Sequence, residues 1–323
     1  MASKIKVDTL ETANGSGSIT INNPINTAGI TSVTLGTSNF VAGVNAGNSI
    51  TSGGNYNTTI GDEAGTAITT GDNNVAVGYN SLTANTTGTD SVAIGHSALL
   101  AQTTGGDNVA IGHLAMSSLT TAGNNTAVGD RAMQANTSGE NNVAIGTLAL
   151  DANTTGASNT AVGRDSLTAN TTGTQNTAVG KSALAANTTA GQNTAMGREA
   201  LFANTTGADN TAIGAAALYS NTTASSNTAV GRSCLINNTT GAENVAVGAE
   251  SLDANTTGVQ NNAIGYLSLT SCTTGSYNVA MGVAALNDTT TGESNVALGH
   301  LSSYSNLTGS SNTAVGQKSF YTN

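Results

Sequence analysis

Three histidines each follow a glycine that recurs through most of the chain: His96, His113 and His300. If the repeats stack, His96 and His113 become neighbours, and a threefold axis would bring further imidazoles near them. Metal ligation needs neutral imidazoles fixed by additional hydrogen-bond partners. The same position of the repeat also holds other types, such as Tyr79 and Lys181. That variety favours exposed histidines, and we expect no metal site.

The acidic residues give no catalytic arrangement. Asp90, Asp107, Asp209 and Glu243 each stand directly before the polar residue that opens their repeat. No two carboxyl groups have surroundings that would separate their pKa values, as acid–base catalysis requires. We interpret these residues as solvated charges that oppose aggregation, with a Ca²⁺ site as the alternative. The sequence predicts no enzyme and no cofactor.

Two further residue types could carry chemistry but have simpler interpretations. Cys234 and Cys272 are 38 residues apart and occupy different positions of the repeat, so we expect no disulfide. The frequent Asn-Thr-Thr triplets, such as 153–155, match a glycosylation acceptor. With no secretory signal at the start of the chain, we interpret them as turn chemistry. A file of such threonines could also bind ice, which stays a remote alternative.

The composition excludes several classes of protein. The chain has 323 residues, of which 8% are charged, with 40 Gly, no Trp and a net charge of −10. Typical soluble proteins are about 25% charged and have larger side chains for a thick core. Eight basic residues form no stripe for nucleic acid or for an acidic membrane. No apolar run is long enough to cross a bilayer, so we expect no membrane insertion.

One phrase repeats without a slip, most clearly as Asn-Thr-Ala-Val-Gly at 159–163. Its glycine recurs every 17 residues from Gly61 to Gly316, sixteen times. Such strict phase is typical of stacked repeats, because one slipped residue would displace every later side chain. We number positions from this phased glycine. Position −2 is alanine and position −4 is asparagine in fifteen copies each, and position +4 is Leu or Met in thirteen.

The alternation predicts an all-β fold, a parallel β-roll or solenoid of about sixteen coils with two short strands per coil. Positions −3 and −1 then share one face, and the alanine at −2 lies on the other. We assign the large aliphatic positions −1 and +4 to the core. The core candidates are Val77, Ile94, Ile111, Val128, Ile145, Val162, Val179, Met196 and Ile213, with Leu82, Leu99, Leu167, Leu184 and Leu201.

A core of this kind is thin, because each coil buries few large side chains and must still order 17 residues. The alanine file offers a flat surface that another chain could approach closely. We therefore predict lateral association, most simply around a threefold axis. The alternative is that alanine lines a narrow single-chain coil. The interface candidates are Ala76, Ala93, Ala110, Ala127, Ala144, Ala161, Ala178, Ala195 and Ala212.

Residues 1–50 show no 17-residue phase and differ from residues 51–323. Alternating stretches at 18–22 and 30–35 predict short strands. We interpret 1–50 as a small β attachment segment and 51–323 as the repeat domain. The stretch Phe-Val-Ala-Gly at 40–43 could be a degenerate first coil, one residue out of register.

Two copies of the phrase, Ser-Val-Ala-Ile-Gly at 91–95 and Asn-Val-Ala-Ile-Gly at 142–146, closely resemble the head repeats of trimeric autotransporter adhesins. The resemblance implies a trimeric, left-handed parallel β-roll. The usual head repeat in that family is shorter. The longer version in this chain, as in 176–189, looks more like repeats in phage tail fibres and related virion proteins.

The setting that this resemblance implies is a virion. Adhesins of that family carry a secretory signal and a C-terminal membrane anchor, and this chain shows neither. Its start, 3–12, is similar to the start of structural proteins from phages of marine cyanobacteria. We expect a trimeric virion fibre or appendage, attached by 1–50 to other virion proteins and directed at a host-surface receptor. The alternative is a non-viral extracellular filament or surface adhesin.

Overall fold

The structure is a computed structural model that describes residues 36–321. In this part of the chain there is no helix, and the regular elements are seventeen strands of three residues each. The strands are β1 (Phe40–Ala42), β2 (Thr58–Ile60), β3 (Val75–Val77), β4 (Val92–Ile94), β5 (Val109–Ile111), β6 (Thr126–Val128), β7 (Val143–Ile145), β8 (Thr160–Val162), β9 (Thr177–Val179), β10 (Thr194–Met196), β11 (Thr211–Ile213), β12 (Thr228–Val230), β13 (Val245–Val247), β14 (Asn262–Ile264), β15 (Val279–Met281), β16 (Val296–Leu298) and β17 (Thr313–Val315).

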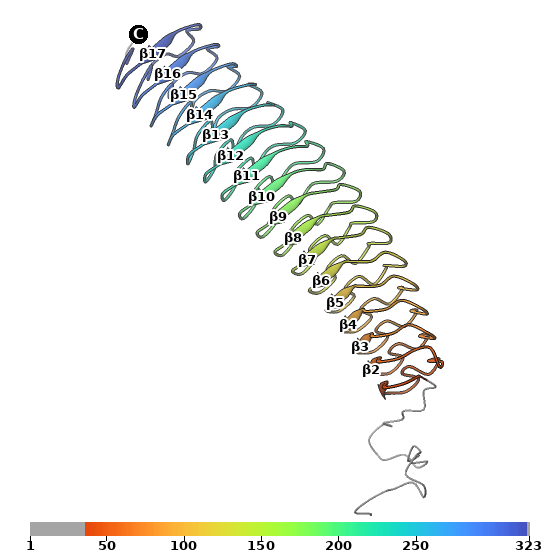
Figure 1. Cartoon of the computed structure of the whole chain (residues 1–323). Helices are drawn as coiled ribbons and strands as arrows, with labels where there is room; N and C mark the ends of the chain where they lie inside the picture. Colours follow the sequence, from red (N-terminus) through yellow and green to blue (C-terminus); the bar gives the residue numbers. More distant parts are fainter. Residues whose placement is uncertain (1–35, 322–323) are drawn as a thin grey trace, which may run out of the picture.

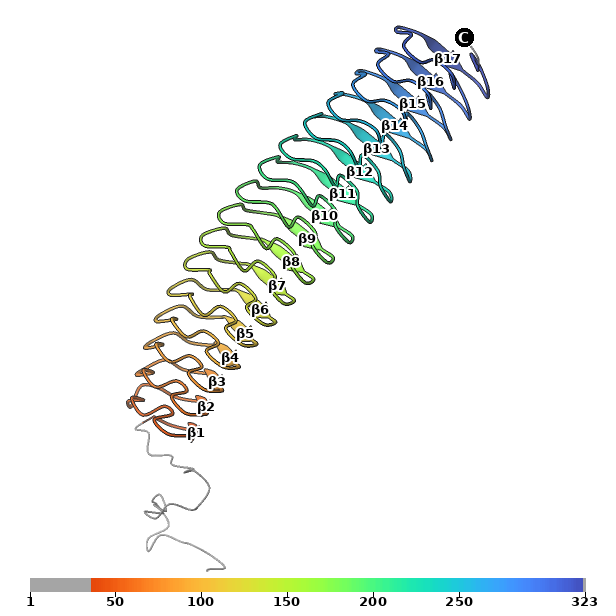
Figure 2. The same ribbon diagram turned by 180° about the vertical axis from the view of Figure 1, so that it is seen from behind.

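Each strand pairs in parallel with the strand of the next coil. Ala161 in β8, for example, lies opposite Ala178 in β9, one period along the chain. Figure 1 and Figure 2 show the coils following one another in chain order along a curved rod, with the strands in a single file. The predicted parallel solenoid with a 17-residue period is confirmed. Its handedness and its trimeric state stay predictions.

The segment after the phased glycine returns along the coil without forming a strand. Asp165 and Leu167 adopt left-handed backbone conformations, with φ angles of 58° and 50°. A parallel strand needs φ near about −120°, so this segment cannot pleat. The prediction of a second strand in each coil is therefore wrong for the described residues. The segment still bonds to the neighbouring coil, because the Leu167 amide donates to the Ala183 carbonyl at 3.0 Å.

The phased glycine has a steric reason. Gly163 has φ of 132°, a conformation that other residues rarely adopt, and an added Cβ would lie 2.6 Å from the carbonyl oxygen of Gly180. The two glycines of adjacent coils therefore approach too closely for any side chain. This contact recurs from coil to coil, which explains why the position never varies.

The solenoid begins before residue 51. Phe40, Val41 and Ala42 pair with Thr58, Thr59 and Ile60, which confirms the degenerate first coil. The offset there is 18 residues, and Thr51 still bonds to Thr69 at that offset. The extra residue lies between Thr51 and Gly54, at a corner of the coil. The domain boundary that we predicted at residue 50 is thus wrong. The predicted attachment role of residues 1–50 stays a prediction, because most of these residues lie outside the described range.

The alanines at position −2 lie inside the coil, so their assignment to a trimer interface is wrong. The alternative, that alanine lines a narrow single-chain coil, is correct. None of them has any exposed surface: Ala76, Ala93, Ala110, Ala127, Ala144, Ala161, Ala178, Ala195 and Ala212 are each 0% exposed.

The small interior explains this choice of residue. Position +3 on the returning segment faces position −2 of the next coil across the interior. There the Ser251 hydroxyl donates to the Ala263 carbonyl at 3.0 Å, and the Cys234 thiol donates to the Ala246 carbonyl at 3.1 Å. The two walls are therefore separated by one small side chain. A β-branched residue at −2 fits only where the facing residue is reduced, as at Thr59, whose methyl group faces Gly65.

The core candidates divide by position. The five leucines at +4 are buried as predicted, each 0% exposed: Leu82, Leu99, Leu167, Leu184 and Leu201. The assignment of the nine candidates at position −1 to the core is wrong, because their side chains point away from the interior. Ile94, Ile111, Ile145, Met196 and Ile213 are 37–43% exposed, and Val77, Val128, Val162 and Val179 are half-buried.

Buried asparagines replace the aliphatic side chains that we expected inside. The side-chain amide of Asn176, at position −4, donates to the Ala190 carbonyl at 2.9 Å. The backbone N–H of Asn176 donates to Asn159 Oδ1 at 3.0 Å. Asn187 at position +7 donates to the same Ala190 carbonyl at 3.0 Å and to Asn170 Oδ1 at 2.9 Å. Two asparagine files therefore run through the interior and join adjacent coils. Each amide satisfies backbone groups that burial would otherwise leave unpaired.

Candidate association surface

The side chains at positions −3 and −1 of β2–β17 form a continuous strip, which we call the outward face. Position −3 is Val or Thr in every coil except Asn262, and position −1 is always aliphatic or Met. No charged residue occurs at either position. In-register parallel pairing places like side chains above one another, so the strip is uninterrupted along β2–β17.

The outward face is large for a surface that water covers. A strand spacing of about 4.8 Å makes the rod about 75 Å long, and a strip about 10 Å wide then covers roughly 750 Å². The continuous aliphatic part of this face is the file at position −1, because position −3 is Thr in eight of the sixteen coils and Asn in one. A stable protein–protein interface buries about 800 Å² on each partner. The outward face therefore has the size of one side of an interface.

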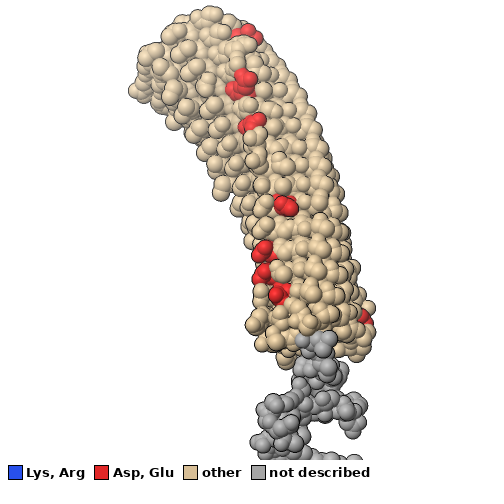
Figure 3. All heavy atoms as spheres, turned by 45° about the vertical axis from the view of Figure 1, so that its right-hand side comes forward, with Lys and Arg blue, Asp and Glu red and all other residues tan. Residues whose placement is uncertain are grey.

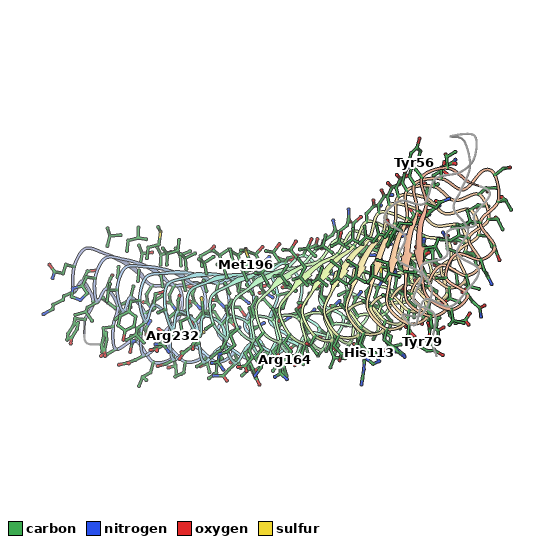
Figure 4. The ribbon with its side chains drawn as sticks, turned by 90° about the horizontal axis from the view of Figure 1, so that it is seen from below. Tyr56, Tyr79, His113, Arg164, Met196 and Arg232 are labelled. Atoms are coloured by element: carbon green, nitrogen blue, oxygen red, sulfur yellow. The ribbon has the colours of Figure 1, made fainter. Side chains whose placement is uncertain are left out.

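The basic residues lie away from this face. The six Lys and Arg of the described range occupy position +1 or +2, after the phased glycine. Figure 4 shows Arg164 and Arg232 on one side of the ribbon, together with Tyr79 and His113, whereas Met196 lies on the opposite side. The six are Arg131, Arg164, Lys181, Arg198, Arg232 and Lys318.

The histidine position is exposed, as the sequence predicted. His96 lies between Tyr79 and His113 in tilted ring contacts, with ring centroids 5.4 and 5.2 Å apart, and His113 Nδ1 lies 2.8 Å from Asp130 Oδ1. All three histidines are exposed. Among residues 36–321, no group of three or more His, Cys, Asp or Glu could hold a metal ion.

Acidic side chains of the described range occur on two main lines: seven lie at positions −6 and −5, and six share positions +1 and +2 with the basic residues. Figure 3 shows a face on which most of the visible Asp and Glu follow one line along the rod and no Lys or Arg is visible. The four acids at position −5 are exposed and lie two residues before the first residue of their strands: Asp90, Asp107, Asp209 and Glu243. The expectation of solvated acids is confirmed for these four.

The threonines of the Asn-Thr-Thr corners do not form a free hydroxyl array. The first threonine of each triplet donates its hydroxyl to the next coil, as Thr171 does to the Thr188 carbonyl at 3.0 Å. Only the second threonine, such as Thr172, is exposed. A single file of hydroxyls gives no specific support for ice binding.

Both thiols are free and buried. Burial raises the pKa of Cys234 to about 12 and that of Cys272 to about 11. A protonated, inaccessible thiol is a poor nucleophile. The two cysteines are therefore structural side chains of the interior.

With this geometry the chain is a parallel β-solenoid with a narrow, amide-rich interior and one uncharged outer face of aliphatic and Thr side chains. No protein-family model and no curated protein matches the sequence. Within the described residues, the structure has no helix that is long and apolar enough to cross a membrane.

Proposed function

We propose that this protein is a structural fibre or appendage of a phage virion, a rigid trimeric spacer that serves host adhesion or carries a receptor-binding tip. The observation that carries the proposal is the outward face, an uncharged strip that follows the rod across sixteen successive strands. A continuous file of exposed aliphatic side chains of that length favours association. A trimer around an axis parallel to the rod would cover it on every copy.

The mechanical role follows from the pairing. Every coil bonds to the next through the strand, the returning segment and the Asn-Thr-Thr corner, for instance Thr160 to Asn176, Leu167 to Ala183 and Thr171 to Thr188. Three lines of backbone hydrogen bonds along the axis resist bending and local opening. Such a rod suits a spacer, and the side chains away from the outward face would meet the solvent and the host.

The proposal is tested first by the mass of the purified full chain in light scattering, which we expect to be three times that of one chain. Met196→Glu places a carboxylate in the outward face and should reduce assembly while leaving the circular-dichroism spectrum unchanged. Thr206→Glu is the matched control, because Thr206 is exposed at a corner away from that face. A folded monomer in the unmodified protein would refute the trimer.

The location is tested separately by labelling. Antibodies against the repeat domain should decorate a thin projection on phage particles in electron micrographs. Labelling of filaments on a cell surface instead would support the alternative, a non-viral filament or adhesin.

A further inference from the structure

We propose that His96 and His113 form a two-imidazole binding site for a divalent transition-metal ion such as Cu²⁺, Ni²⁺ or Zn²⁺, with Asp130 orienting His113. The variety of residues at position +1 led us to expect no metal site from the sequence. The structure brings two members of that position together with a carboxylate. The inference is independent of the proposed self-association, because Figure 4 shows His113 on the opposite side of the ribbon from Met196 of the outward face.

Backbone hydrogen bonds hold the two histidines one coil apart. The Leu114 amide donates to the His96 carbonyl at 3.0 Å, and the Arg131 amide donates to the His113 carbonyl at 2.9 Å. Stacking of the coils then separates the two side chains by about 4.8 Å where they leave the backbone. Two histidines four residues apart on a helix are about 5–6 Å apart at Cβ, and such a pair binds one zinc ion. The coil spacing is therefore suitable for the same chemistry.

The two imidazole rings lie close enough to share an ion. Their centroids are 5.2 Å apart, and their planes are inclined by 47°. Two nitrogens bound to one zinc ion are about 3.4 Å apart, because the bonds are about 2.1 Å long and the geometry is tetrahedral. Rotation about the side-chain bonds brings one nitrogen of each ring to that separation. Tyr79 covers the other side of His96, with ring centroids 5.4 Å apart, and keeps that ring beside His113.

Asp130 supplies the second interaction that a metal-binding histidine needs. Its Oδ1 lies 2.8 Å from His113 Nδ1. In the neutral ring Nδ1 therefore carries the proton, and Nε2 keeps the lone pair that binds a metal ion. The other carboxylate oxygen, Oδ2, lies 3.9 Å from Arg131 Nε, which holds the carboxylate from its far side. This arrangement fixes the tautomer and makes the imidazole a better ligand.

The ion would have two protein ligands. Asp130 is two coils from His96, a separation of about 10 Å, which is too large for both to bind one ion. This geometry agrees with the absence of a three-ligand group between residues 36 and 321. Both histidines are exposed, so water completes the coordination. Those water positions are the ones at which a ligand of another molecule can bind the ion.

Metal titration of the full chain by calorimetry tests the site. We expect about one Cu²⁺, Ni²⁺ or Zn²⁺ ion per chain, with Cu²⁺ bound most tightly. Ca²⁺ and Mg²⁺ should not bind, because they take oxygen ligands. His96→Ala should weaken binding by at least about 100-fold, because the second linked ligand is lost. His300→Ala is the matched control and should change nothing, since the neighbours of His300 at position +1 are Val283 and Gln317.

The positioning role of Asp130 has its own measurement. Asp130→Asn should weaken binding by about 10–100-fold while the circular-dichroism spectrum stays unchanged. Asp130→Glu should restore most of the affinity, because it returns a carboxylate to the same position. Equal affinities of the unmodified protein and Asp130→Asn would contradict this role.

A gain of binding tests whether the coil spacing is sufficient. Val283→His places a second histidine one coil from His300. This variant should bind a second ion more weakly than the first, because the new pair has no carboxylate partner. A stoichiometry that stays at one ion per chain would contradict the argument from spacing.

The outcomes separate this proposal from the proposed function. Absence of binding for all three transition metals, or equal losses in His96→Ala and His300→Ala, would overturn the site. A folded monomer that still binds one ion through His96 would end the proposed trimer and leave the metal site standing.

Discussion

At the scale of single residues, the irregular copies of the repeat show how closely its side chains depend on one another. Ser91 is the only residue other than asparagine at position −4, and Gln102 in the same coil is the only glutamine at +7. Gln102 Nε2 donates to the Ser91 hydroxyl at 3.1 Å and to the Gly105 carbonyl at 2.9 Å. The longer amide thus fills the space that the shorter serine leaves.

This pairing predicts strong coupling between the two sites. Ser91→Asn alone should lower the free energy of unfolding, because the new amide competes with that of Gln102 for one space. Gln102→Asn alone should do so by leaving Ser91 without its partner. The double variant restores the common pair, so the coupling free energy should be about 1–3 kcal/mol. Urea unfolding of the unmodified protein, the two single variants and the double variant measures this coupling. Strictly additive effects of the two substitutions would contradict the prediction. A distant pair, Ser91→Asn with Gln175→Asn, is the control and should be additive.

A second exception follows the same rule. Thr59 replaces alanine at position −2, and Gly65 replaces leucine at +4 of the same coil. An added Cβ at Gly65 would lie 2.7 Å from the Thr59 methyl group. The larger residue on one wall therefore requires the absence of a side chain on the other.

The buried thiols give a prediction with a pH dependence. The pKa of Cys234, about 12 in the folded chain, lies above the ordinary thiol value of 9.0. The stability is then unaffected below pH 9 and decreases as the pH rises from 9 towards about 12, because the unfolded chain ionises first. Cys234→Ala should remove about half of that decrease, because Cys272, with a folded pKa of about 11, contributes most of the rest. Urea unfolding at about pH 8 and about pH 10.5 measures it, and slow reaction of the native thiols with a disulfide reagent at the lower pH provides the control.

At the scale of the coil, the distinction between the two sides of the strand can be tested directly. Ala178→Leu overfills the gap between the walls and should cost about 1–3 kcal/mol of unfolding free energy. Val179→Leu, one residue further and half-buried on the outward face, should change it by less than about 0.5 kcal/mol. Thermal unfolding of the two variants decides the point. Similar losses in both would place Val179 inside as well.

Sequence reasoning predicted the period, the glycine turn and the alternation, because each depends on the local chain alone. It placed the wrong side of the strand inside, since hydrophobicity favoured valine and isoleucine over alanine. The residue that could have decided this is the asparagine at −4, which alternation puts on the same side as the alanine at −2. A nearly invariant asparagine directly before a short strand needs buried partners, and Asn176 has them. The left-handed backbone of Leu167 had no signal in its residue type.

At the scale of the whole rod, phase is the property that matters. Removing the 17 residues 164–180 should leave a folded rod that is one coil shorter, with a melting temperature within a few degrees. Removing one residue fewer than a full repeat should put all later coils one residue out of phase. The asparagine files would then be broken, and the protein should be destabilised. One residue inserted between Thr188 and Ala190 should be tolerated, because the first coil accepts one at the same corner. Circular dichroism and rod length in electron micrographs measure these effects, and equal behaviour of the two deletions would contradict them.

The same scale limits what the sequence predicts about assembly. Charge at positions −5 and +1 is visible in the sequence, but its meaning depends on which side of the strand faces out. Only the structure places Met196 outward, on the opposite side of the ribbon from Arg164 and Arg232.

The buried polar side chains between residues 36 and 321 are all amides or hydroxyls, and none of them is an acid, a base or a histidine. Amides and hydroxyls bind no proton between about pH 2 and pH 9, so the hydrogen bonds between coils keep their strength across that range. Acid would discharge the carboxylates on the surface without reaching the interior. We therefore expect the rod to stay folded in acid, and far-ultraviolet circular dichroism at about pH 3 would measure this directly.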